Sequence, residues 1–185
     1  MSSREVVLSQ KKMNIEELIL THYKSREFIS KYELFIDNPA LIADLLKVVQ
    51  SDLKYPYPAY ASWWLFHIAR SKATLLASYQ TVLIDCVLTN ENGSVLRNTM
   101  GALLELQLIE YREGELLDRL FHLLITEDYK VAIHVYALYL LIDFTKKYPE
   151  IKQEIVEIIR LKESKPHTPA LNMGIRNYLK ATKSV

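Results

Sequence analysis

An apolar segment of helical length recurs four times in this chain at a nearly constant interval. Each of the four is the second member of a pair of such segments, and their midpoints are Leu65, Gly101, Ala137 and Gly174, spaced 36, 36 and 37 residues apart. A period of this length is typical of a solenoid, in which each helical pair buries its apolar face only by stacking on its neighbours. The interval therefore predicts a stack of helical pairs.

Helix-period spacing of apolar residues continues between these segments, and only four glycines and six prolines interrupt it. We expect about ten helices and no strands, forming an all-α, α-α superhelix. Residues 1–12 are polar and weakly patterned, so we expect a flexible N-terminus followed by one repeat domain over 13–185. One helix is expected to span about 74–88. Helix-start signals occur at several polar positions, namely Asn14, Asn38 before Pro39, Asn92 or Ser94, and Pro149.

The composition is that of an ordinary globular chain of 185 residues, half of them hydrophobic and a quarter charged. The net charge of +1 disfavours a dedicated nucleic-acid binder, which needs a strong basic excess. No stretch resembles a signal peptide or a membrane span, so we expect a cytoplasmic protein that does not contact membranes. The single cysteine, Cys86, lies in an apolar run and is expected to be a buried, inert thiol.

Four stretches resemble HEAT-like helical-repeat proteins, and more narrowly small bacterial HEAT-like proteins of unknown function. They are Ala61–Leu65, Ser94–Thr99, Lys130–Ala132 with Leu138–Leu141, and Lys146–Lys152. The resemblance covers nearly the whole chain after Ser25 and implies a HEAT or armadillo-like solenoid. Some members of that group are labelled adenylosuccinate lyase. This label is not supported here, because nothing in the chain matches the serine-containing signature loop of that enzyme superfamily.

Patterns that carry catalysis are missing from the sequence. It has neither a phosphate-binding glycine loop nor a Gly-x-Ser-x-Gly elbow, and its five histidines are isolated from other metal ligands. We therefore expect no catalytic residues, no metal and no cofactor. Carboxylates such as Glu127 and Asp128 lie in a break between helices, where they serve as helix caps.

The two adjacent tryptophans cannot face the same core, because neighbouring helical residues point about 100° apart. Trp64 shares a stripe with Leu65 and Ile68 and is expected to be buried. Trp63 is expected to be partly exposed near His67. It forms either an aromatic contact patch or packing against the N-terminal helices.

Charge separates between the two helices of each pair. The first helices, 38–52, 74–90, 113–128 and 149–163, carry a net −7, whereas the second helices, 56–72, 92–107, 130–147 and 166–183, carry +7. In a HEAT-like superhelix the second helices line the concave surface, which would then be mildly basic. Many of these cations lie at helix C-termini, where the macrodipole alone explains them.

These observations predict a non-enzymatic binding or scaffold module that holds a protein partner, through an acidic segment, on its concave face. The residues expected to bind this partner are Trp63, Arg97, Asn98, Lys130, His134 and Arg176. The alternative is a HEAT-like DNA-binding protein or alkylated-base DNA glycosylase, in which Asp143 would be the only internal acid near the groove. A homodimer is a third possibility.

Overall fold

The computed structural model describes residues 14–25, 32–163 and 168–184. These residues form ten α-helices and three 3-10 segments, with no strand among them. The α-helices are α1 (Ile15–Ser25), α2 (Glu33–Asp37), α3 (Ile42–Val49), α4 (Tyr57–Lys72), α5 (Gln80–Thr89), α6 (Gly93–Leu103), α7 (Glu113–Ile125), α8 (Val131–Lys147), α9 (Lys152–Glu163) and α10 (Pro169–Ala181). The 3-10 segments are η1 (Pro39–Leu41), η2 (Ala73–Tyr79) and η3 (Pro149–Ile151).

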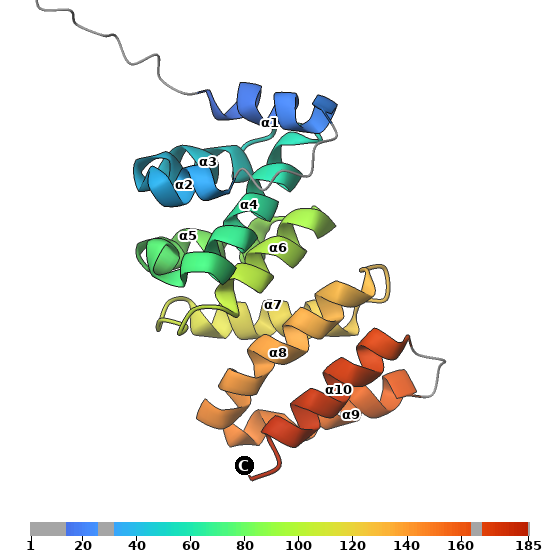
Figure 1. Ribbon diagram of the computed structural model, residues 1–185. Helices are drawn as coiled ribbons and strands as arrows, with labels where there is room; N and C mark the ends of the chain where they lie inside the picture. Colours follow the sequence, from blue (N-terminus) through green and yellow to red (C-terminus); the bar gives the residue numbers. More distant parts are fainter. Residues whose placement is uncertain (1–13, 26–31, 164–167, 185) are drawn as a thin grey trace, which may run out of the picture.

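The helices stack in chain order as an elongated all-α superhelix, with α1 at one end and α9 and α10 at the other (Figure 1). Helices α4, α6, α8 and α10 form one layer, and α3, α5, α7 and α9 pack behind them as the first members of the pairs. The four residues that mark the 36-residue interval lie in α4, α6, α8 and α10, one in each. The predicted fold class is thus confirmed.

Polar residues start several helices as expected. The side chain of Asn14 accepts hydrogen bonds from the amides of Glu16 and Glu17, and that of Asn92 caps α6 in the same way. The Asn38 cap was predicted wrongly, because its side-chain amide donates back to the carbonyl of Leu34 instead of accepting from the next helix. The single helix expected over 74–88 is divided, since η2 precedes α5.

The core runs through the stack between the two layers. Trp64, Leu65 and Ile68 of α4 are fully buried, and burying each such side chain stabilises the fold by about 1.5–3 kcal/mol. Small residues allow close approach where helices cross: a Cβ added to Gly174 would lie 3.1 Å from a methyl group of Val135. Gly101 and Gly174 both lie inside helices, as predicted.

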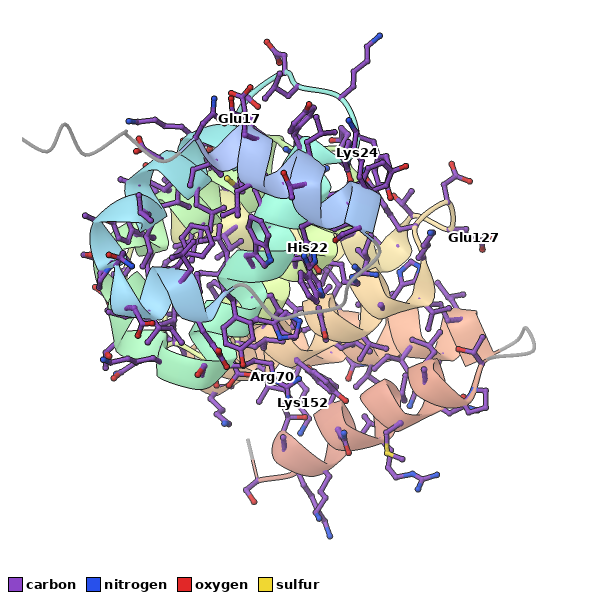
Figure 2. The ribbon with its side chains drawn as sticks, turned by 45° about the horizontal axis from the view of Figure 1, so that its top comes forward. Glu17, His22, Lys24, Arg70, Glu127 and Lys152 are labelled. Atoms are coloured by element: carbon purple, nitrogen blue, oxygen red, sulfur yellow. The ribbon has the colours of Figure 1, made fainter. Side chains whose placement is uncertain are left out.

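The N-terminal end is closed by aromatic packing. His22 of α1 is buried, with its ring centroid 5.7 Å from that of Trp64 and 6.2 Å from that of Trp63 (Figure 2). Trp64 is fully buried, as expected. Cys86 is also buried, and this burial raises the pKa of its thiol to about 11. The thiol therefore stays protonated at neutral pH, which agrees with an inert cysteine.

The stretch predicted to be a flexible N-terminus, 1–12, lies outside the described residues. Among the helices that the structure describes, none combines the length and the apolar character that a membrane span requires. The described residues also contain no cluster of three histidine, cysteine or acidic side chains that could hold a metal ion.

Candidate functional site

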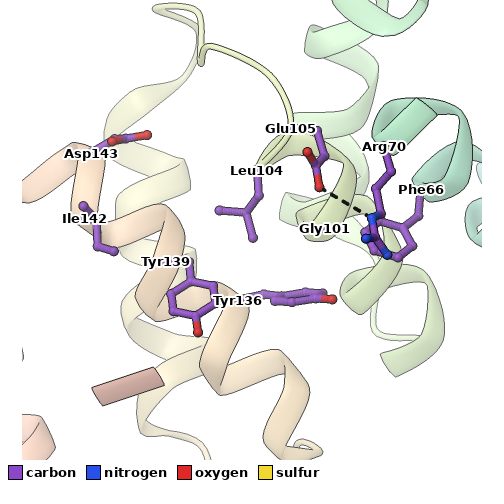
Figure 3. A pocket seen from close by; sticks show the side chains of 9 residues that line it. All are labelled: Phe66, Arg70, Gly101, Leu104, Glu105, Tyr136, Tyr139, Ile142 and Asp143. Carbon is purple, nitrogen blue, oxygen red and sulfur yellow. Dashed lines mark ion pairs between the residues drawn. The ribbon is translucent and has the colours of Figure 1, made fainter. Parts of the chain in front are cut away.

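An open groove of about 480 Å³ lies on the layer formed by the second helices of the pairs. Three of these helices contribute its walls (Figure 3). The lining residues are Phe66 and Arg70 from α4, Gly101 from α6 with Leu104 and Glu105 just beyond its end, and Tyr136, Tyr139, Ile142 and Asp143 from α8. Aromatic rings and aliphatic chains form the interior, and the charged groups stand at the rim.

The groove is built from a spacing that recurs on each of its three helices. Residues four apart lie on the same helical face, one turn from each other. Phe66 is followed at this spacing by Arg70, and Tyr139 by Asp143. In the same way Gly101 precedes Glu105, which lies in the turn after α6. Side by side, the three helices create two rows of side chains. The aromatic row contains Phe66, Tyr136 and Tyr139, and the charged row contains Arg70, Glu105 and Asp143.

Gly101 forms the floor between the rings of Phe66 and Tyr136. A Cβ at this position would lie 2.8 Å from two ring atoms of Phe66 and 3.1 Å from one of Tyr136. The ring centroids of Phe66 and Tyr136 are 6.5 Å apart, so they meet across α6 only because the glycine has no side chain. The aromatic row is therefore continuous from α4 to α8.

The charged row is unevenly paired. Arg70 places its guanidinium 5.6 Å from the ring centroid of Phe66 and its Nε 3.9 Å from a carboxylate oxygen of Glu105. Asp143 has Lys146 as its cation, at 3.6 Å, and both of these side chains are more than half exposed. The three charged lining residues carry a net charge of −1. The groove therefore has an acidic rim on the α8 side.

Comparison with models of known protein families identifies the family of this chain. A family model described as a HEAT repeat domain matches residues 15–182. The chain belongs to the HEAT repeat family. Searches of curated proteins and of solved structures found no match. HEAT repeats are commonly protein-interaction scaffolds and are generally non-catalytic, so the groove of this HEAT repeat chain is considered as a binding surface.

Two of the residues predicted from the sequence lie on the faces that form the groove. Trp63 is half-buried and precedes Phe66 by three positions, on the same face of α4. Its ring centroid is 4.4 Å from that of His67, and burial together with the charge of Arg70 lowers the pKa of His67. Arg97 is also half-buried and lies one turn before Gly101 on α6. Neither side chain is among the residues that line the groove, and the ring of Trp63 stacks on that of His22 in α1.

Lys130 and Arg176 are exposed but lie outside the groove lining. Lys130 occupies the N-cap position of α8. On α10 it is Asn177 whose side-chain amide donates to the hydroxyl of Tyr139 at 3.0 Å. Arg176 points about 100° away from Asn177 around the helix and faces solvent. The four cations and aromatics proposed from the sequence thus do not converge on one point.

Two predicted partner contacts need correction, because their side chains are buried. Asn98 is 3% exposed, and its amide donates to the hydroxyl of Ser62 at 3.1 Å, which ties α6 to α4. His134 is 5% exposed, with Nδ1 2.9 Å from the carbonyl oxygen of Leu123 and Nε2 3.1 Å from that of Tyr129. Both are polar core residues that satisfy internal hydrogen-bonding groups, so neither reaches a partner.

Most residues that line the groove were not among those predicted to bind a partner. The apolar segment around Ala137 nevertheless contains two tyrosines three residues apart, Tyr136 and Tyr139. Tyrosine hydroxyls need water or a polar partner, so two tyrosines on one face of an otherwise apolar helix indicate that this face is solvated. That signal would have located the α8 wall of the groove.

Proposed function

We propose that this HEAT repeat chain is a non-enzymatic binding module that holds an acidic segment of a partner protein on the layer formed by α4, α6, α8 and α10. The observation that carries the proposal is the open groove whose helical faces also present Trp63 and Arg97. A half-exposed tryptophan and an arginine are the residue types that dominate the energetics of protein interfaces.

The cations of this layer support an acidic partner. Among the described residues, no ion pair joins Arg97, Lys130 or Arg176 to a carboxylate. Arg97 donates from Nε to the side-chain oxygen of its neighbour Asn98 at 3.2 Å, which leaves its terminal nitrogens for other acceptors. Arginine binds carboxylates in a bidentate geometry, so Arg97 is the preferred anchor for an acidic side chain.

Charge reversal tests this proposal. The double variant Arg97→Glu, Lys130→Glu should lose capture of the partner from extracts of the native cell, measured by pull-down and mass spectrometry. Its helical circular dichroism signal should be retained and its Tm should change little, because Lys130 is exposed, Arg97 is half-buried, and neither forms an ion pair with the described residues. Lys47→Glu on α3 is the matched control, since Lys47 is 73% exposed on the other layer. Equal capture by the double variant and the control would contradict the proposal.

One observation supports the DNA-binding alternative, and another opposes it. Asp143 does line the groove, as a glycosylase acid would have to. The lining nevertheless contains a single cation, Arg70, which is paired with Glu105, so the groove lacks the excess of basic side chains that a run of phosphates requires. Titration of a labelled DNA duplex at two salt concentrations separates the alternatives, because phosphate binding weakens steeply with salt.

A further inference from the structure

We infer that the bound segment is zwitterionic: a basic side chain enters the groove between Tyr139 and Asp143, while an acidic side chain pairs with Arg97. This inference rests on the proposed binding function and specifies the chemistry of its partner. The site is the α8 wall of the groove, where a carboxylate and two aromatic rings line an open space of about 480 Å³.

The charged row contains two carboxylates, those of Glu105 and Asp143, and one cation, Arg70. Arg70 is the cation of the row and pairs with Glu105. Asp143, on the opposite wall, is 63% exposed, and its cation is the similarly exposed Lys146, at 3.6 Å. An exposed ion pair of this kind contributes little and is readily exchanged. A cation from a partner therefore completes the row at Asp143.

Arg70 of the groove itself already packs in the way inferred for the partner's basic side chain, over an aromatic ring and beside a carboxylate. Arg70 lies over the ring of Phe66, 5.6 Å from its centroid, and approaches the carboxylate of Glu105. On the opposite wall, Tyr139 and Asp143 have the same four-residue spacing of ring and carboxylate. A lysine or arginine of the partner can lay its aliphatic stem on Tyr139 and present its charge to Asp143, where the ring adds a cation–π attraction.

The two charged groups that would hold the segment lie on neighbouring helices of the layer, Arg97 on α6 and Asp143 on α8. The segment therefore runs from α6 to α8, with its acidic side chain at Arg97 and its basic side chain at Asp143.

Selection from a displayed library of random 12-residue peptides tests the inference. Peptides enriched by the wild-type chain should combine an acidic with a basic residue at a constant spacing. Selection with the Asp143→Asn chain should lose the basic residue and keep the acidic one, and selection with Arg97→Gln should do the reverse. Asp118→Asn on α7 is the control, because Asp118 is an exposed acid on the other layer and should leave the enriched pattern unchanged.

A selected peptide then gives the affinity readout by fluorescence polarisation. Asp143→Asn should weaken its binding about tenfold, the effect of one charge-assisted contact. Tyr139→Leu should weaken it as well, whereas Tyr139→Phe, which keeps the ring, should not.

The other outcomes separate the two proposals. Enrichment of purely acidic peptides, insensitive to Asp143→Asn, would overturn the zwitterionic segment and leave the acidic-partner module standing. A library that yields no peptide above its starting frequency would also overturn it, and the fate of the binding function would then be decided by the pull-down with the Arg97 and Lys130 variant.

Discussion

Gly101 shows how a single residue can define the candidate site. Glycine costs about 1 kcal/mol relative to alanine inside a helix, so its place in α6 needs a compensating gain. The gain is packing: the rings of Phe66 and Tyr136 close over its Cα, and a Cβ there would stand 2.8 Å from the Phe66 ring. Gly101 therefore supports both the stability of the stack and the shape of the groove.

Replacing Gly101 with leucine should destabilise the protein by overpacking, on the order of 1–3 kcal/mol, measured by denaturant unfolding. Gly114→Ala is the matched control, since no atom lies within 4 Å of a Cβ at that position of α7. The control should be neutral or more stable by up to about 1 kcal/mol, the helix-propensity gain. An unchanged or raised stability in the leucine variant would show that Phe66 moves aside without cost.

At the scale of elements, the connection between α7 and α8 depends on one buried imidazole. His134 of α8 reaches back to the carbonyl of Leu123 in α7 and to that of Tyr129 in the connection. Burial is the largest influence on this side chain and, with the charge of Lys162, lowers the pKa of His134 below its ordinary value of 6.5. The two carbonyls favour the protonated ring, but burial outweighs them, so the folded protein prefers the neutral ring, which donates to one carbonyl only.

This preference predicts a pH dependence with a definite sign. As the pH falls below 6.5, the unfolded chain takes up a proton at residue 134 before the folded protein does. The stability that the neutral ring contributes above pH 6.5 is lost as the pH falls through the folded-state pKa. The Tm of the wild type should thus decline on acidification more steeply than that of His134→Gln. Parallel declines between pH 8 and pH 5 would assign the acid sensitivity to other groups.

At the scale of the whole molecule, the helical pairs form a linear stack in which each pair rests on its neighbours (Figure 1). The last pair is joined to α8 by Tyr178, whose hydroxyl lies 2.9 Å from that of Thr145 in a fully buried contact. In such a linear array, stability is a sum of repeat and neighbour terms, so damage at one end stays local. The C-terminal pair packs on the groove through α8, where Asn177 of α10 donates to the hydroxyl of the lining residue Tyr139.

Tyr178→Ala should accordingly loosen the C-terminal end more than the centre. Removing a buried aromatic side chain costs about 3–5 kcal/mol at the site. Hydrogen exchange should accelerate in α9 and α10 and change little in α4 and α6. Leu96→Ala in α6, a fully buried position in the middle of the stack, is the comparison that should accelerate exchange on both of its sides. Uniform acceleration in the Tyr178 variant would indicate one cooperative unit instead of a chain of neighbours.

The 36-residue interval, the helical content, the caps at Asn14 and Asn92 and the buried place of Trp64 were all predictable from the chain alone. Each of these features depends on residues close together in sequence, where helical periodicity links residue type directly to position. The same local reasoning predicted that Trp63 is partly exposed, and its side chain is half-buried.

The groove itself emerges only when residues about 35 positions apart are brought together, as Phe66, Gly101 and Tyr136 are, or Arg70 and Glu105. Asn98 and His134 were misassigned for the same reason, since their hydrogen-bonding partners, Ser62 and the Leu123 carbonyl, belong to other helices. From the sequence alone, a polar side chain is predicted to be exposed as long as its hydrogen-bonding partner on another helix is unknown. The way neighbouring helices pack therefore decides which polar groups are buried and which apolar side chains line a groove. The spacing of residues along one helix does not say which face of the neighbouring helix they contact.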